Sequence, residues 1–192
     1  MKKIVFLMSH LGSGHNLLSN FLDKTSRIQL FDTKKIYSNL LDLDYLTNSI
    51  HKRGDVSAIY LEELLFNHRL TDRKIVKYFK FIYLIREPHG TLNEILDKYK
   101  GYTPLSALRY YQFRLRGMFE YAKRSKGFFL TYNDLEKKEK FSELVAYLNL
   151  KDIPSFEKTS TDTPDLIPNT ILKEAEDVYE RYLYSFNQIF KV

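Results

Sequence analysis

The 192-residue chain contains no cysteine. It also contains no apolar run near the ~18 residues that a membrane-spanning helix requires. Without cysteine there is no disulfide, no zinc–thiolate site and no cysteine nucleophile, which fits a cytosolic protein. The start of the chain, Met-Lys-Lys before five apolar residues, is too short for a signal peptide and lacks a small-residue cleavage site. We therefore expect a cytoplasmic protein with no transmembrane segment.

The composition is that of an ordinary globular protein, with 44% hydrophobic and 28% charged residues. No repeat, linker or low-complexity tract interrupts the chain, so we expect a single domain over residues 1–192. The formal net charge of +6 favours anionic ligands, among them nucleotides, acidic glycans, nucleic acid and membrane surfaces. The alternative is that the lysine and arginine side chains only solvate the surface.

Strand-like and helix-like segments alternate along the chain. Apolar runs predict strands at residues 3–8, 27–32, 80–85 and 127–132. Apolar residues at helical spacing predict helices at residues 15–23, 34–50, 57–68, 72–79, 91–98, 104–124, 141–150 and 170–190, and residues 151–168 are expected to form a long loop. This alternation predicts an α/β fold of three layers, α/β/α, with a central, mostly parallel sheet.

A glycine-containing loop follows the first predicted strand and leads into a helix. Gly12 and Gly14 allow a tight turn and close approach to a ligand, and the helix N-terminus favours an anion, above all a phosphate. The alternative is that the loop only turns the chain. His15 and Asn16 follow Gly14 in place of the lysine and hydroxyl of the nucleoside-triphosphate loop, which disfavours a kinase or nucleoside triphosphatase. Leu17 stands where the dinucleotide fingerprint has its third glycine.

Arg86 directly follows another strongly apolar strand, residues 80–85. This position places a planar cation with several donors at the edge of the sheet, where it suits bidentate contact with a phosphate. The alternative is an ion pair with Glu87 or another carboxylate. Ligands of parallel α/β sheets bind at the carboxyl ends of the strands. If the two strands are close, Arg86 and the glycine loop share one crevice.

Three segments together resemble a known family. Residues 12–18 (Gly-Ser-Gly-His-Asn-Leu-Leu), residues 80–88 (Lys-Phe-Ile-Tyr-Leu-Ile-Arg-Glu-Pro) and, more softly, residues 129–135 with residues 147–150 resemble motifs of the sulfotransferases that use 3'-phosphoadenosine 5'-phosphosulfate (PAPS). The three occur in the family's order and spacing and cover most of residues 3–150. The resemblance implies a topology like that of the P-loop nucleoside triphosphatases and a divergent member of the sulfotransferase family.

The resemblance also implies a set of cofactor-binding residues. The loop at residues 13–16 would hold the 5'-phosphosulfate, Arg86 the 3'-phosphate, and Tyr132 the adenine. Two departures stand out, because Gly12 replaces the family's basic residue and Glu94 replaces a serine that supports the 3'-phosphate. Glu94 would repel this phosphate, and Asn93 or Thr91 could take the place of the family's serine. The full expected set is Gly12, Ser13, Gly14, His15, Asn16, Leu17, Arg86, Asn93, Glu94 and Tyr132.

Catalysis would need a positive charge near the leaving phosphate and a general base for the acceptor hydroxyl. His15 or His10 is expected to supply the charge, with a neutral, hydrogen-bonded loop histidine as the alternative in each case. Glu62, on the helix predicted at residues 57–68, is one candidate for the base, and the alternative for any single candidate is a solvated charge on the helix surface. The neighbouring candidates are Glu63, His68, His51 and Asp55.

The expected function is sulfuryl transfer from PAPS to a hydroxyl on a glycan or a small metabolite, with adenosine 3',5'-bisphosphate as product. No metal and no nucleic-acid partner are expected. Two alternatives stay open at this point. One is a phosphotransferase related to the P-loop proteins that has lost its lysine, and the other is a nucleotide-binding protein that has lost the chemistry.

Overall fold

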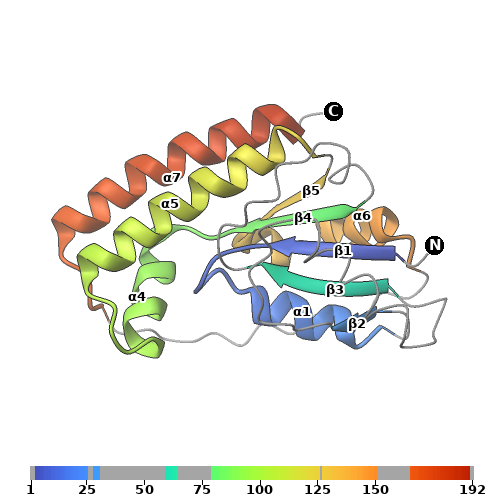
Figure 1. Cartoon of the computed structure of the whole chain (residues 1–192), viewed down its shortest axis with the longest axis horizontal. Coiled ribbons are helices and arrows are strands. Elements are labelled where there is room, and N and C mark those ends of the chain that lie inside the picture. The colour runs from blue at the N-terminus through green and yellow to red at the C-terminus, as the bar shows by residue number, and fades with distance from the viewer. Residues whose placement is uncertain are drawn as a thin grey trace, which may run out of the picture.

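The structure, a computed structural model, describes residues 3–25, 28–30, 59–64, 79–125, 127–150 and 165–190. Five strands form one sheet in the order β2-β3-β1-β4-β5, and every neighbouring pair is parallel (Figure 1). The strands are β1 (Lys3–Met8), β2 (Ile28–Leu30), β3 (Ile59–Leu64), β4 (Lys80–Ile85) and β5 (Gly127–Thr131).

The described α-helices all lie in segments for which the sequence pattern predicts a helix. They are α1 (His15–Asp23), α4 (Pro88–Lys98), α5 (Pro104–Ala122), α6 (Lys138–Leu148) and α7 (Asn169–Phe190), with a short 3-10 helix, η1 (Tyr132–Glu136), after β5. Thr103 caps α5 by accepting from the N–H of Ser106, and a proline follows at the first helical position. None of the helices within the described ranges is long and apolar enough to cross a membrane.

Helices cover both faces of the sheet. Phe6 of β1 and Tyr83 of β4 pack on the side of α4, α5 and α7, whereas Val5 and Ile82 pack on the side of α1 and α6. Successive side chains of a strand point to opposite faces, so strands buried on both faces carry unbroken apolar runs. In Figure 1, α5 and α7 run side by side across one face. The three-layer α/β/α fold with a parallel sheet is therefore confirmed.

The strand ends that precede the glycine loop and Arg86 are neighbours. β4 pairs directly with β1, with Met8 opposite Tyr83. The glycine loop leaves the end of β1, and Arg86 follows the last residue of β4. Because parallel strands end at the same edge of a sheet, both features lie at one edge, as expected.

The helix predicted at residues 57–68 is wrong, because residues 59–64 form strand β3 between β1 and β2. The spacing of leucines in this segment fits a helix, but a short apolar run fits a strand equally well. Ile59 and Leu61 are both buried and belong to the same side of the sheet, as alternate strand residues do. The helices predicted at residues 34–50 and, apart from its last residue, 72–79 lie outside the described residues, as does most of the loop at 151–168.

Candidate functional site

The glycine loop after β1 packs closely against α4 and η1. Gly12 has φ +72° and Gly14 has φ +83°, values that favour glycine. A Cβ atom at Gly12 would lie 2.6 Å from the carbonyl oxygen of Thr91, and one at Gly14 would lie 2.6 Å from the ring of Tyr132. No side chain fits at either position. The basic residue that the resemblance implies at position 12 would meet the backbone of Thr91.

The loop ends at an open helix N-terminus. α1 begins at His15, its N-cap residue is Gly14, and no side chain caps it. Leu17 and Leu18 donate their N–H groups to the carbonyl oxygen of Gly14, and the positive end of the helix dipole lies at this N-terminus. Ser13 is completely buried, and its Oγ has no hydrogen-bond partner among the described residues. The positive end of the α1 dipole favours a polar, anionic ligand such as a phosphate or phosphosulfate group at this N-terminus.

His10 links the two strand ends and carries no charge. Its Nδ1 lies 2.9 Å from the carbonyl oxygen of Leu11, and its Nε2 lies 3.2 Å from the backbone nitrogen of Arg86. Because the N–H of Arg86 must donate to Nε2, Nδ1 carries the proton. Complete burial lowers the pKa of His10 to about 3. His10 is thus the neutral, hydrogen-bonded loop residue of the alternative interpretation, which corrects the expectation that it supplies positive charge.

Arg86 is held in place by its backbone and its side chain. Its carbonyl oxygen accepts from the hydroxyl of Tyr111 at 2.8 Å, and its Nη1 donates to the carbonyl oxygen of Gly12 at 3.0 Å. The guanidinium carbon lies 4.1 Å from the ring centre of Tyr132, a cation–π contact. Only 8% of Arg86 is exposed. The guanidinium is therefore fixed between the glycine loop and an aromatic ring.

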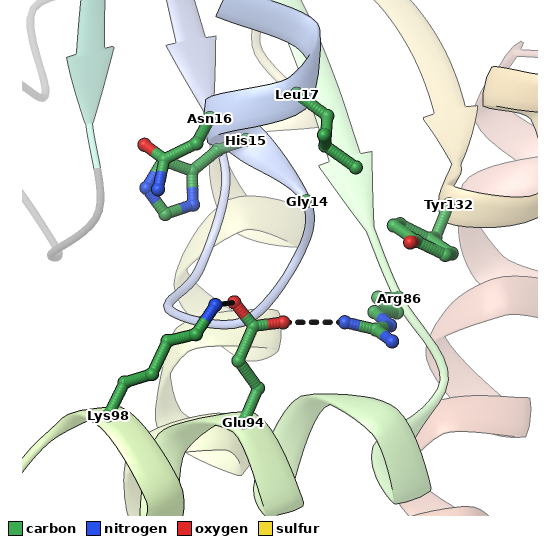
Figure 2. A pocket seen from close by; sticks show the side chains of 8 residues that line it. All are labelled: Gly14, His15, Asn16, Leu17, Arg86, Glu94, Lys98 and Tyr132. Atoms are coloured by element: carbon green, nitrogen blue, oxygen red, sulfur yellow. Dashed lines mark hydrogen bonds and ion pairs between the residues drawn. The ribbon is translucent and has the colours of Figure 1, made fainter. Parts of the chain in front are cut away.

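Arg86 also forms the ion pairs of the alternative interpretation. Its Nη1 lies 2.7 Å from Oε2 of Glu94, and its Nε lies 3.6 Å from Oε1 of Glu87. The second oxygen of Glu94 lies 2.8 Å from Nζ of Lys98, so Glu94 bridges two cations (Figure 2). The Nε of Arg86 is buried without a hydrogen-bond partner among the described residues. A carboxylate therefore already engages the guanidinium at the edge of the pocket.

The start of α1 and the side chains of Arg86, Glu94, Lys98 and Tyr132 line one pocket of about 160 Å³ (Figure 2). This volume is below the ~300 Å³ at which sites for drug-sized ligands begin, so the pocket suits the phosphate end of a nucleotide. Its lining contains most of the expected cofactor-binding residues, namely Gly14, His15, Asn16, Leu17, Arg86, Glu94 and Tyr132. Gly12 and Ser13 do not line this pocket, but the carbonyl of Gly12 contacts Arg86.

Asn93 points elsewhere. It is completely buried, and its Oδ1 accepts from the backbone N–H of Leu166 at 2.7 Å. This bond ties α4 to the segment before α7. Asn93 is therefore not placed to take over the role of the family's serine toward a phosphate.

The sequence analysis did not identify two residues at or near the site, Lys98 and Arg114. Lys98 lines the pocket, and its spacing of four residues from Glu94 on α4 was the available signal. Arg114 of α5 is 1% exposed, and its Nε donates to the carbonyl of Ser9 at 2.7 Å. Burial lowers the pKa of Arg114 to about 10, so it stays charged at neutral pH. Its place in the buried stripe between Tyr111 and Met118 was the signal.

Glu62, one candidate for the base, does not lie on a helix. It belongs to β3 and pairs with Phe6 of β1, inside the sheet. Within the described ranges, no three histidine, aspartate or glutamate side chains gather as ligands for a metal ion. The chemistry that the described residues offer is anion binding, by an open helix N-terminus on one side and a guanidinium on the other.

Comparison with known proteins supports the fold and not the family. No family model matches the chain, and no curated protein matches it. Among solved structures, the chain resembles mouse sulfotransferase SULT7A1 complexed with PAP, with a TM-score of 0.59 and 11% sequence identity over 95% of this chain and 85% of the mouse chain. The resemblance found in the sequence predicted this fold, and the chain has the fold of a sulfotransferase.

Proposed function

We propose that the protein is a sulfotransferase that moves a sulfuryl group from PAPS to an acceptor hydroxyl on a glycan or a small metabolite. One observation carries the proposal: the N-terminus of α1 and the guanidinium of Arg86 line the same pocket. The fold match to a sulfotransferase complexed with PAP agrees with this site. PAPS, when bound, supplies the activated sulfuryl group.

The proposed work of the loop is electrostatic. The backbone and the helix dipole at the start of α1 bind the 5'-phosphosulfate and stabilise the charge that develops on the leaving phosphate. Such transfers depend mainly on positioning and charge stabilisation, as in phosphoryl transfer. A rigid loop serves this role without a lysine, because the backbone amides need no reorganisation.

The proposed work of Arg86 is to bind the nucleotide at its 3' end. A guanidinium suits a phosphate because its donors form a planar fork. Tyr132 holds the guanidinium plane by the cation–π contact and packs against Gly14. His15 lines the pocket as the first residue of α1 and stays a candidate for charge or proton transfer. Glu62 stays a prediction for the general base.

One rival proposal has a specific observation in its favour. Glu94 already engages Arg86 at 2.7 Å, and no basic side chain fits at position 12. Both features suit a protein that binds a nucleotide without transferring a group. The phosphotransferase alternative is disfavoured because no lysine follows Gly14 in the loop.

The test is titration with adenosine 3',5'-bisphosphate, followed by calorimetry. We expect binding that weakens about 10–100-fold in Arg86→Ala, the loss of a charged hydrogen bond. Arg109→Ala, an exposed arginine on α5, is the control and should bind normally. Transfer is then measured with labelled PAPS and a panel of hydroxyl acceptors. Binding of ATP with magnesium in place of the bisphosphate would support the phosphotransferase, and binding without transfer would support the non-enzymatic protein.

A further inference from the structure

Glu94 lies where the 3' end of the proposed nucleotide would meet Arg86. Its side chain is only 15% exposed and comes from the middle of α4. One carboxylate oxygen lies 2.7 Å from Arg86, and the other lies 2.8 Å from Lys98 (Figure 2). Held from both sides, Glu94 leaves this position only if two ion pairs break.

The charges around Arg86 are balanced before any ligand enters. Arg86 and Lys98 carry two positive charges, and Glu94 and Glu87 lie within ion-pair distance of them with two negative charges. A 3'-phosphate would bring further negative charge close to Glu94. In a partly buried pocket the repulsion between like charges is weakly screened. The attraction of Arg86 for a phosphate is therefore offset by Glu94.

A 3'-hydroxyl meets the same group favourably. A carboxylate accepts several hydrogen bonds, so Glu94 can accept from a ribose hydroxyl and keep both ion pairs. Dinucleotide-binding folds use the same distinction, with an acidic residue for a ribose hydroxyl and an arginine for a phosphate. This pocket contains both groups in direct contact.

We infer that Glu94 determines the specificity of the nucleotide site at the ribose 3' position. It removes the advantage of a 3'-phosphate, so the site binds an adenosine 5'-phosphate or 5'-phosphosulfate with a free 3'-hydroxyl about as well as its 3'-phosphorylated form. The inference rests on the proposed function, since it assigns this pocket to the nucleotide.

The experiment compares the affinities of adenosine 3',5'-bisphosphate and adenosine 5'-monophosphate by calorimetry. For the unmodified protein we expect the two dissociation constants to agree within about tenfold. In Glu94→Gln, which keeps the shape and removes the charge, the bisphosphate should bind about tenfold tighter, with no gain for the monophosphate. Glu143→Gln, at an exposed ion pair with Lys140 on α6, is the matched control and should leave the ratio unchanged.

The change in the ratio decides the inference. A ratio that Glu94→Gln does not shift toward the bisphosphate would overturn it, and Glu94→Ser provides the same comparison should the glutamine variant misfold. Failure of both nucleotides to bind would overturn the inference and the proposed function together. The expected shift without sulfuryl transfer from either 5'-phosphosulfate nucleotide would support the inference and count against the proposed function alone.

Discussion

The two sides of the pocket bind anions by different means. On the α1 side the site is made of backbone, with Gly12 and Gly14 at positive φ and no charged side chain in the loop. On the β4 side the site is made of side chains, with Arg86 engaged by Glu94 and stacked on Tyr132. The first depends on chain geometry, whereas the second depends on the balance of neighbouring charges.

This difference separates what can change in the site from what cannot. The loop has no free volume at Gly12 or Gly14, so substitution there disturbs the fold before it changes binding. Around Arg86, a single charge removed at Glu94 or Lys98 changes the field at the guanidinium while the helix carrying both remains. Specificity is therefore expected to vary on the β4 side and to stay constant on the α1 side.

The largest effect is expected for Gly12→Ala. A left-handed backbone costs a non-glycine residue about 1–2 kcal/mol, and overpacking adds about 1–3 kcal/mol. The Cβ atom would meet backbone, the carbonyl of Thr91 at 2.6 Å, so neither partner can move aside cheaply. We expect the free energy of unfolding, measured with urea, to fall by about 3 kcal/mol.

Asn149→Ala is the matched control for this substitution. Asn149 ends α6 at φ 60° and is exposed, so the variant shows the cost of the backbone conformation alone. A loss of about 1 kcal/mol is expected there. Equal losses at the two positions would show that the contact with Thr91 is easily relieved, and the α1 side would then tolerate change after all.

His10 connects the two sides, and its burial predicts a pH dependence. Its folded-state pKa is lowered to about 3 from the ordinary 6.5, so the unfolded chain binds a proton that the folded protein does not. Stability therefore rises with pH between about 3 and 6.5 and falls as the solution is acidified through that window. The slope well below pH 6.5 is about 1.4 kcal/mol per pH unit for this group.

Urea unfolding at pH 7, 6 and 5 measures this slope. His10→Gln should lose about 1 kcal/mol at pH 7, because hydrogen bonds to Leu11 and Arg86 are disturbed, and should flatten the slope. His89→Gln, at an exposed histidine on α4, should retain the slope. If the slope were unchanged in His10→Gln, other groups would account for the pH dependence of unfolding. The burial of His10 between the two sides of the pocket would then not be supported.

A smaller effect is expected on binding from Tyr132→Leu. The leucine keeps an apolar contact with Gly14 but removes the cation–π contact that orients Arg86. Such contacts contribute about 0.5–1 kcal/mol, so the affinity for adenosine 3',5'-bisphosphate should fall about two- to fivefold. Tyr184→Leu, at an exposed tyrosine on α7, should leave the affinity unchanged. A tighter complex in Tyr132→Leu would show that the ring restrains the guanidinium rather than positioning it.

The sequence predicted the fold well where apolar runs were long. The run of residues 80–85 and the glycine loop identified two strand ends, and β1 and β4 are indeed neighbours. The segment at 59–64 failed because its leucines fit a helical period, while its pairing with β1 and β2 decides its structure. Such pairing joins residues far apart in the sequence, and no local pattern contains it.

The sequence predicted several residues that line the pocket, but not the contacts between them. Arg86 was expected at the pocket, and a carboxylate partner was one of two interpretations, but the sequence does not show that Glu94 reaches it. Glu94 and Arg86 are eight residues apart and lie on different elements, a strand end and a helix. The sequence analysis treated His10 as a possible cation because the local sequence does not show its burial. His10 is completely buried and packs against Tyr111 of α5, about a hundred residues later in the chain.

The smallest effect is expected for Lys98→Gln. Lys98 is half exposed and contacts Glu94 at spacing i,i+4, so its ion pair should contribute about 0.3–0.5 kcal/mol to stability. Lys140→Gln, which removes an exposed ion pair on α6, should cost about the same. Only Lys98→Gln should weaken binding of adenosine 3',5'-bisphosphate, about two- to threefold at low salt, and high salt should remove the difference because it screens an exposed charge. A loss of stability well above that of Lys140→Gln would mean that Lys98 fixes Glu94 as firmly as Arg86 does, and the β4 side would then be as rigid as the loop.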